Sequence, residues 1–392
     1  MKFLIITRAN YPSSSWGNRV RMIAKGLIEN GVKVEVLVTH PWPSKENIDI
    51  SEGFVKYLTS TGEKKESIFS ILKQLKTLFL LRKKLNNYKN IDKVLLTGDR
   101  WLDSFIVSRF CKKHKIEFLV EVVDEIGRQF DKKKNTVYST LAILNRKLFN
   151  SSLNKIDKLF VLSSYLENKY KSFLPENKII RSSPTFVNKT DFQFKLSNYN
   201  YFEKNNLQII KNDILITYAG SCERPNGLFF FLKAVCNLIL NKKHSDIKIF
   251  FIFHIGNIEI IKEQINKLGI TNNVIIVPGI DPNFIPSVYN KSDILILPEQ
   301  GDVVANAGFP GKVGEYLISG KAIITTNFSD LSYYLKNNYN CMMSEISDIE
   351  SYQHNLEILI NNKEKRTDLG ANAQITGIKN FDYIEAVKIY IE

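Results

Sequence analysis

Short apolar runs alternate with helical patterns along almost the whole chain. Between the first two runs, Val20, Ile23, Ala24 and Leu27 recur at helical spacing, and Gly31 follows as a helix stop. Runs that are apolar throughout indicate parallel strands covered by helices on both faces, so the pattern predicts an α/β protein. The runs are KFLIIT, KVEVLVT, KVLLTG, FLVEVVD and KLFVLS in the first half, and DILITYAG, IKIFFIFHIG, VIIVPG, DILILPE and AIITTN in the second.

Residues 185–212 interrupt this alternation. The segment is polar, rich in Asn and aromatic residues, and has no clean period, so we interpret it as a connection between two units. A chain of 392 residues also exceeds what a single core normally serves. We therefore predict two doubly wound units with parallel sheets, over residues 1–190 and 191–370, followed by an amphipathic helix over 371–392.

Composition and simple motifs narrow the function classes. The four cysteines are scattered without a CxxC pair, and the five histidines form no HExxH motif or Cys/His cluster. The apolar run SILKQLKTLFLL is too short and too charged to span a bilayer, and the first residues lack the features of a signal peptide. We expect a cytoplasmic protein with reduced thiols, no metal site and no tightly bound cofactor.

The net charge of +14 is compatible with a nucleic acid, an anionic lipid or a phosphorylated substrate, and also with a composition effect alone. The lysines are spread out and no nucleic-acid-binding motif is present, so we expect no nucleic-acid partner. Residues 63–89 predict a basic amphipathic helix. Such a helix either rests on an anionic membrane surface or covers the sheet with a solvated lysine face.

The stretch FPGKVGEYLISGKAII, residues 309–324, carries a lysine and a glutamate inside an apolar helical pattern. It is not a P-loop, because Asn306 stands where the first glycine is needed and Val313 follows the lysine. With Pro310 in the first helical turn, the free helix amides and Lys312 can hold an anion, while Glu315 accepts hydrogen bonds from a ribose diol. The alternative is a solvated ion pair between Lys312 and Glu315, worth at most about 0.5 kcal/mol.

In order and spacing, several segments together resemble a GT-B-fold glycosyltransferase of the family 4 type, over nearly the whole chain. The resemblance implies an acceptor-binding first unit, a donor-binding second unit, and a C-terminal helix that packs back toward the first. It rests on FPGKVGEYLISGKAII, similar to the family's (F/L)PxKxxEYxxxGxP segment, and on VIIVPGIDPNFIPSVYNKSD, ITYAGSCERPNG, NYPSSSWGNRVRMIAKGLIENGVKVEVLV and KIDKLFVLSSYLENKY.

The resemblance further implies a donor site for a nucleotide-sugar, most simply a UDP-sugar. Lys312 and Arg224 would neutralise its diphosphate as the catalytic charges, and Glu315 would bind its ribose. The further donor-binding residues that we expect lie mostly in loops at strand ends and are Gly17, Gly220, Ser221, Gly279, Ile280, Asn306, Ala307, Gly308 and Phe309.

The sequence departs from the family at two places. Ala307 stands where the family has a second glutamate, eight residues before Glu315, so the donor sugar stays open and Asn306 or backbone amides would take over that contact. In the phosphate loop, Arg224 is displaced between Ser221 and Asn226. We interpret these differences as divergence, because subfamilies with the PxKxxEY form commonly lack the first glutamate.

The acceptor side is expected at the strand ends of the first unit. Asp124, which ends the run FLVEVVD, is the candidate base for the acceptor hydroxyl, with a helix N-cap as its alternative role. Basic residues at the N-terminal turn of the first helix oppose the helix dipole, which points either to an anionic ligand or to solvated arginines. The acceptor-binding residues that we expect are Asn18, Arg19, Asp99, Arg100 and Glu125.

The resemblance implies transfer of a hexose or N-acetylhexosamine, with retention, to a saccharide or lipid-linked acceptor in surface-glycan assembly. The sequence has no Asp-x-Asp motif for a metal–diphosphate complex, so we expect metal independence, with Glu299 and Asp302 as the carboxylates nearest to the position of Ala307. Two rivals remain: a sugar-nucleotide epimerase or phosphorylase of the same fold, and a non-catalytic partner subunit.

Overall fold

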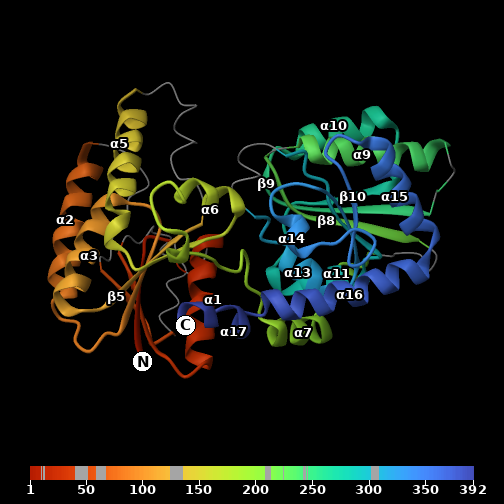
Figure 1. Ribbon diagram of the computed structural model, residues 1–392. Helices are drawn as coiled ribbons and strands as arrows, with labels where there is room; N and C mark the ends of the chain where they lie inside the picture. Colours follow the sequence, from red (N-terminus) through yellow and green to blue (C-terminus); the bar gives the residue numbers. More distant parts are fainter. Residues whose placement is uncertain are drawn as a thin grey trace. The chain divides into compact units, whose positions relative to one another are not determined.

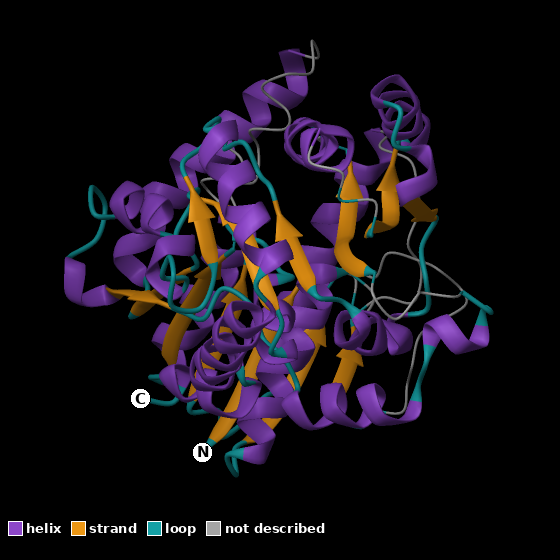
Figure 2. Cartoon of the chain, turned by 90° about the vertical axis from the view of Figure 1, so that its right-hand side faces the viewer, coloured by secondary structure: helices purple, strands orange, loops and turns teal. Residues whose placement is uncertain are grey.

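The computed structural model describes residues 1–9, 11, 14–39, 52–58, 68–123, 136–207, 213–223, 225–241, 244, 246–301 and 309–392. These residues form two compact units, Met1–Phe186 with Tyr383–Glu392, and Val187–Asp382 (Figure 1). Each unit contains one parallel sheet with helices on both faces, as the uninterrupted apolar runs predict. Figure 2 shows the strands enclosed by helices. The chain is therefore an α/β protein with two doubly wound units, as predicted.

The first unit contains a seven-stranded parallel sheet in the order β3-β2-β1-β4-β5-β6-β7. Its strands are β1 (Lys2–Thr7), β2 (Lys33–Val38), β3 (Val55–Tyr57), β4 (Lys93–Thr97), β5 (Glu117–Val122), β6 (Lys158–Val161) and β7 (Ile179–Arg181). One face packs against α2 (Ile68–Leu85), α3 (Trp101–His114) and α5 (Thr136–Ser152). The other face packs against α1 (Ser15–Glu29) and the C-terminal α17 (Tyr383–Ala386). The short α6 (Ser164–Tyr170) follows β6.

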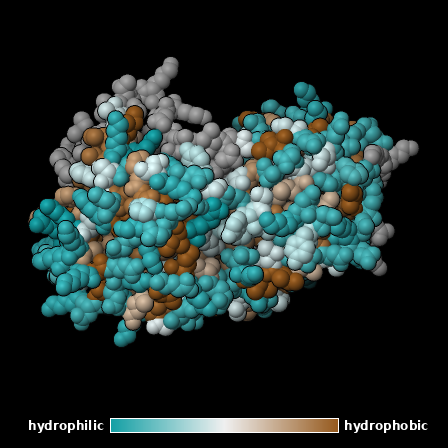
Figure 3. Space-filling view, in the orientation of Figure 1, coloured by the Kyte–Doolittle hydropathy of each residue, from teal (hydrophilic) through white to brown (hydrophobic). Residues whose placement is uncertain are grey.

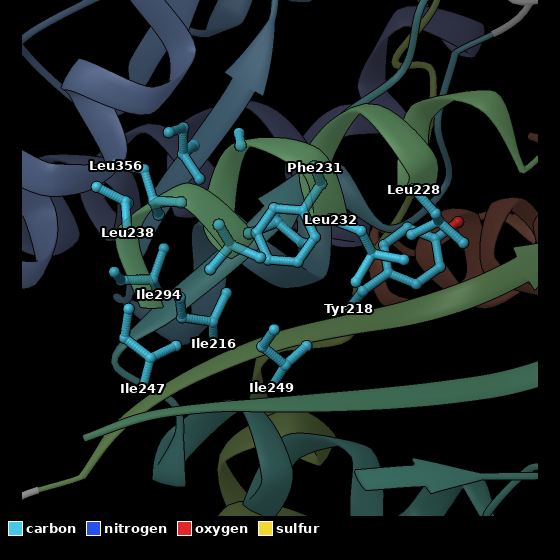
Figure 4. Packing of buried hydrophobic residues seen from close by; sticks show 14 of the residues in the cluster. Ile216, Tyr218, Leu228, Phe231, Leu232, Leu238, Ile247, Ile249, Ile294 and Leu356 are labelled. Atoms are coloured by element: carbon cyan, nitrogen blue, oxygen red, sulfur yellow. The ribbon is translucent and has the colours of Figure 1, made fainter. Parts of the chain in front are cut away.

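The second unit contains a six-stranded parallel sheet in the order β10-β9-β8-β11-β12-β13. Its strands are β8 (Ile214–Cys222), β9 (Ile247–Gly256), β10 (Val274–Val277), β11 (Ile294–Leu297), β12 (Ala322–Thr326) and β13 (Met342–Ser344). One face packs against α9 (Asn226–Asn241), α10 (Ile258–Leu268) and α15 (Ile349–Asn361). Figure 4 shows side chains of α9 and β8, with Phe231 and Ile216 among them, gathered in that core.

The opposite face of the second sheet packs against several short helices and one long helix. These are α7 (Lys189–Asn198), α8 (Tyr201–Lys204), α11 (Ile285–Lys291), α13 (Val313–Ser319), α14 (Leu331–Tyr334) and the long α16 (Lys363–Phe381). Helices α7 and α8 correct the interpretation of residues 185–212 as an irregular connection. Phe192 and Phe202 of this segment are buried in the core of the second unit, which gives it a fixed helical structure.

The end of the chain also differs from the expected single helix. Residues 371–381 belong to α16 in the second unit, and the segment from Tyr383 belongs to the first unit. There the chain forms only α17 and a 3₁₀ turn, Lys388–Tyr390. The last segment is anchored by buried contacts within the first unit: Asn30 Nδ2 donates to the carbonyl of Ile384 at 2.9 Å, and Lys93 Nζ to that of Ile391 at 3.1 Å.

Candidate functional site

The strand order of the second unit places a candidate site beyond β8 and β11. From β8 the chain adds β9 and β10 on one side, and β11, β12 and β13 then continue on the other. Adjacent strands whose connections leave in opposite directions create a crevice at their carboxyl ends, where ligands bind in open α/β sheets. Here β8 ends in Gly220–Cys222, β11 is followed by Glu299, and the side chain of Lys312 reaches the same edge.

Lys312 lies directly before α13 and extends its ammonium group over β8. Its Nζ lies 3.8 Å from the ring centroid of Tyr218, a cation–π contact. Part of the Lys312 side chain is accessible, but the surrounding protein atoms desolvate its ammonium group. This desolvation lowers the pKa of Lys312 to about 8, while the negative charges of Glu299 and Glu315 oppose the shift. Lys312 forms no ion pair with any described residue, so its charge is available to a ligand.

Gly220 makes room for this lysine. A Cβ atom at position 220 would collide with Lys312 Nζ and would lie 2.9 Å from Tyr218 Oη. The ladder between β8 and β9 shifts register at Gly220 and Ser221, and the Tyr218 hydroxyl donates to the carbonyl of Ser221 at 2.9 Å. The strand end is therefore held in place under the ammonium group.

Glu315 lies on the first turn of α13 and faces α11. Tyr289 Oη donates to Glu315 Oε2 at 3.4 Å, and the Tyr289 ring packs edge-on against Tyr316 with centroids 5.1 Å apart. Burial raises the pKa of Glu315, while the Tyr289 hydrogen bond and the charges of Lys195 and Lys312 act in the opposite direction. The carboxylate is thus held by one long hydrogen bond and keeps acceptor capacity.

Two structural details expected at this helix end, a first turn at Pro310 and an ion pair between Lys312 and Glu315, are not found. The predicted first turn at Pro310 is wrong, because α13 begins at Val313, with Lys312 as its N-cap, and Val313 N donates to the Pro310 carbonyl at 3.1 Å. A helix of two turns contributes little through its dipole, so the positive charge here is that of Lys312. The alternative of a surface ion pair is not formed either, because no contact of 4.0 Å or less joins Lys312 to Glu315 in this described segment.

The other predicted donor residues are partly described. Ser221 Oγ, at the end of β8, donates to Glu223 at 3.3 Å, and Gly279 has a positive φ of 78° in the turn after β10. Ile280 and Phe309 pack on the second core. Gly17 belongs to the first unit, where its amide donates to Ser14 Oγ at 2.9 Å and is therefore occupied. The predictions that lie outside the described residues concern Asp124, Glu125, Arg224, Asp302, Asn306, Ala307 and Gly308.

On the acceptor side, the interpretation of Arg19 as a residue that contacts a ligand is wrong. Arg19 is buried, its Nη2 lies 2.8 Å from Glu121 Oε1, and its Nη1 donates to the Pro184 carbonyl at 3.0 Å. Tyr390 donates its hydroxyl to the same Glu121 oxygen. The anion that offsets the misplaced arginine is thus an internal carboxylate, and the network ties the C-terminal segment to the first sheet.

The remaining acceptor candidates lie at the carboxyl edge of the first sheet. Asn18 is exposed on the first turn of α1. Asp99 is buried after β4, and its carbonyl accepts a hydrogen bond from Asn145 Nδ2 at 3.1 Å, while Arg100 is the N-cap of α3. Nearby, Thr97 Oγ1 donates to Thr7 Oγ1 at 2.8 Å across the β1–β4 switch point. The arrangement allows ligand contacts from Asn18 and Arg100, and it favours a structural role for Asp99.

Sequence reasoning missed the two tyrosines of the site, Tyr218 and Tyr289. Both lie inside segments that carried the family resemblance, ITYAGSCERPNG and FIPSVYNKSD, but nothing in the apolar pattern separates them from core residues. Their hydroxyls distinguish them, because each reaches a polar group at the sheet edge.

The next two observations concern metal-ligand groups and membrane-spanning helices among the described residues. In the described ranges, no three His, Cys, Asp or Glu side chains are grouped as ligands for a metal ion. Among the helices described here, none combines the length and apolar character required to cross a bilayer.

Comparisons with known proteins agree with this geometry. Residues 201–376 match the model of the family described as Glycosyl transferases group 1. That range contains Gly220, Tyr289, Lys312 and Glu315. A search of curated proteins gives no match.

Solved structures share the fold over the full length. The Anabaena protein HepE in complex with UDP has a TM-score of 0.73 at 12% identity, covering 100% of this chain and 98% of HepE. WaaG, a glycosyltransferase involved in lipopolysaccharide biosynthesis, has a TM-score of 0.68 at 14% identity, covering 99% and 98%. The UDP-GlcNAc 2-epimerase from Neisseria meningitidis bound to UDP-GlcNAc has a TM-score of 0.60 at 17% identity, covering 100% and 98%.

Proposed function

We propose that this chain is a glycosyltransferase that uses a UDP-sugar as donor, because it shares the GT-B fold of solved glycosyltransferases and most of its second unit matches the Glycosyl transferases group 1 model. The observation that carries the proposal is the ammonium group of Lys312, which pairs with no carboxylate in the described part of the chain and lies over Gly220 beside Tyr218 at the β8–β11 switch point. The proposal draws further support from HepE, which has the same fold and is solved with UDP and with UDP-glucose.

In this proposal Lys312 binds the diphosphate. Glycosyl transfer expels a nucleoside diphosphate, and a fixed cation facing it stabilises the negative charge that develops on the leaving group. The lysine is desolvated before the ligand arrives, so its interaction with a phosphate is stronger than that of a solvated lysine. Arg224 is a second proposed charge for the same diphosphate.

Glu315 binds the ribose in the same proposal. Its carboxylate lies one helical turn beyond Lys312 and accepts only the long hydrogen bond from Tyr289 among the described groups. A carboxylate can accept both hydroxyls of a diol at once, which fixes the nucleoside relative to its diphosphate. Lys312 and Glu315 together therefore contact the diphosphate and the ribose, which all UDP-sugars share.

The reaction that we propose moves a hexose or N-acetylhexosamine, with retention at the anomeric carbon, to a saccharide or lipid-linked acceptor. Asp124 is the proposed base at the acceptor hydroxyl, and the departing diphosphate assists in taking the proton. We propose a role in surface-glycan assembly by analogy with WaaG, which is involved in lipopolysaccharide biosynthesis, and a cytoplasmic location. No metal ion takes part, because Lys312 supplies charge that a metal would otherwise provide.

A peripheral position at the inner face of the cell membrane belongs to the proposal as well. Helix α2 ends in Arg82, Lys83 and Lys84, and Phe79 on the same helix is 69% exposed. An aromatic side chain next to basic residues suits the interface of an anionic bilayer.

A sugar-nucleotide epimerase is the second candidate, because the Neisseria epimerase shares the fold over the full length of this chain. An epimerase converts its UDP-sugar without an acceptor, whereas a transferase releases UDP at a rate that depends on one. Incubating the enzyme with UDP-GlcNAc alone and following the sugar by NMR separates the two. Accumulation of an epimer in that incubation favours the epimerase.

The donor assignment is tested by thermal unfolding with a panel of nucleotides. A ligand at 100 times its dissociation constant adds about 2.7 kcal/mol to the free energy of unfolding. We expect UDP to raise the midpoint temperature of unfolding more than ADP, GDP or CDP does. The substitution Lys312→Ala should remove this increase. If no nucleotide stabilises the wild-type protein, the non-catalytic partner subunit becomes the better reading.

A further inference from the structure

A pocket of about 950 Å³ lies in the first unit, at the edge of the sheet where β5 begins. It is formed by the C-terminal half of α3, the first residues of β5 and the 3₁₀ turn Leu153–Lys155. This is the amino edge of the first sheet, opposite to the carboxyl edge where ligands of catalysis bind in α/β proteins. A smaller pocket of about 300 Å³ between α2 and α3 adjoins it and shares Phe105 and Arg109.

Four cationic side chains line the larger pocket, Arg109, Lys112, Lys115 and Lys155. None of them forms an ion pair or a side-chain hydrogen bond with any residue that the structure describes. Arg109 and Lys155 contact the ring of Phe105, at 4.6 and 5.5 Å from its centroid. Two cations therefore converge on one aromatic side chain, which attracts them weakly but does not neutralise them.

Several other cations of the same unit have carboxylate partners, whereas others, such as Lys83 and Lys113, have none among the described residues. Examples of the pairs are Lys2 with Glu35, Arg8 with Asp103, Arg21 with Glu52, Lys93 with Glu117, and Arg181 with Glu167. The carboxylates that line the pocket are occupied: Glu117 pairs with Lys93 and Lys158, and Asp157 accepts the amide of Phe118 at 2.8 Å. Among the described residues, the lining therefore carries four cations against two carboxylates, of which Glu117 is already paired and Asp157 keeps its charge, so the net charge of the lining is positive.

Helix dipoles explain only part of this arrangement. Lys112 belongs to the last turn of α3, where a cation is favoured. Arg109 lies farther from the helix end, Lys115 follows the helix, and Lys155 comes from a different element. The charges of Arg109, at the middle of the helix, and of Lys155, from a separate 3₁₀ turn, are not needed to complement the dipole of α3.

We propose that this pocket is a second, non-catalytic binding site for a phosphorylated ligand of up to nucleotide size. Its volume lies within the range of small-molecule sites, and its lining offers charged donors and the amide of Asn154. Figure 3 shows hydrophilic residues with hydrophobic ones between them on the first unit, and the four cations of the lining are exposed to water. The ligand's phosphate is either that of a soluble ester or that of a lipid head group. This inference does not depend on the donor assignment in the second unit.

Hydrogen exchange on the full-length protein tests the proposal, with inorganic pyrophosphate and phosphatidylglycerol vesicles as separate probes and phosphatidylcholine vesicles as the neutral reference. We expect slower exchange in peptides covering residues 105–118 and 150–158. The variant Arg109→Gln/Lys112→Gln should need about tenfold or more probe to reach the same protection, because hydrogen bonds between charged groups and a phosphate are strong. Lys233→Gln/Lys267→Gln, which removes two exposed lysines of the other unit, should leave it unchanged.

Protection by pyrophosphate identifies a soluble ligand, and protection by phosphatidylglycerol vesicles alone identifies a lipid phosphate; either result supports the site. Absence of protection with both probes overturns it, and so does protection that survives Arg109→Gln/Lys112→Gln. Peptides covering residues 309–320 report separately on the proposed donor site, so failure at one site is distinguishable from failure at the other.

Discussion

The ammonium group of Lys312 lies in the space that the Cβ atom of any residue other than glycine would occupy at position 220. The two residues belong to different elements, the end of β8 and the segment before α13. Because the glycine lacks a side chain, the lysine can cross the strand end and contact the Tyr218 ring. The absence of one carbon atom at position 220 therefore decides where the positive charge of the site lies.

Gly220→Ala should displace Lys312 and reduce UDP affinity about tenfold or more, approaching the effect of Lys312→Ala. No strained φ contributes, because Gly220 is outside the set of residues with positive φ. The measurement is calorimetric titration with UDP. Gly53→Ala is the control, because a Cβ atom there meets nothing within 4 Å and should leave affinity unchanged. Wild-type affinity in Gly220→Ala would show that the position of Lys312 does not matter to the nucleotide.

UDP affinity should fall as the pH rises above about 8. Burial lowers the pKa of Lys312 to about 8 in the free protein, and a bound diphosphate favours the charged form, so binding takes up a proton in this range. Above pH 7 the terminal phosphate is already ionised, which leaves the lysine as the group that titrates. The loss should approach tenfold per pH unit, measured by titration between pH 7 and 10.

Lys312→Arg separates this effect from general alkaline changes. Arginine stays charged over the whole range, so its UDP affinity should be nearly constant with pH, even if it is lower than that of the wild type. An equal decline in both proteins would assign the pH dependence to another group.

Glu315→Gln should weaken binding of ribose nucleotides more than it slows the chemical step. The wild type should prefer UDP over 2′,3′-dideoxy-UDP, because the carboxylate accepts hydrogen bonds from both hydroxyls of the diol. In Glu315→Gln this preference should shrink to a few-fold. Tyr289→Phe, which removes the hydroxyl that contacts Glu315, serves as the comparison for indirect effects. An unchanged preference in Glu315→Gln would place the ribose elsewhere.

The sequence predicted the central strands well and the small features poorly. Runs such as KFLIIT and IKIFFIFHIG are apolar throughout because their strands are covered on both faces, and β1 and β9 follow them. The strands β3, β7 and β13 were missed, since each has three residues and lies at or near a sheet edge, where a continuous apolar run is not required.

The site residues likewise divide into those that the sequence indicated and those that it did not. Lys312 and Glu315 stood out because charges inside an apolar helix need a reason. The role of Gly220 could not be read from the sequence, because it depends on a lysine far along the chain that passes over that strand end. Arg19 was misread for a related reason: its partner Glu121 is distant in sequence and becomes visible only when β5 packs beside α1.

Arg19→Met should lower the free energy of unfolding by about 3–5 kcal/mol, because it leaves Glu121 buried without its cation. The double variant Arg19→Met/Glu121→Gln should recover part of this loss, since no uncompensated charge remains. Lys262→Met breaks an exposed pair with Glu259 and is the control, with an expected change of about 0–1 kcal/mol. Denaturant unfolding gives the three values, and a loss in Arg19→Met no larger than in the control would contradict the role of this network.

Transfer should continue in the presence of EDTA and should retain the anomeric configuration of the donor sugar. In the proposal the diphosphate faces Lys312 and Arg224, so fixed side chains stabilise the charge that develops as the glycosidic bond breaks. Retention follows if the acceptor attacks on the face from which UDP departs, with the diphosphate oxygen helping to take the acceptor's proton and positioning supplying most of the rate. The measurements are the initial rate of UDP release with and without EDTA, and NMR of the first product formed. Activity that is abolished by EDTA and restored by manganese would show that a metal ion, and not Lys312, supplies most of the positive charge that neutralises the diphosphate. An inverted product would instead require attack from the opposite face, where the diphosphate oxygen cannot help, so that Asp124 alone would have to take the acceptor's proton and Asp124→Asn would remove the activity.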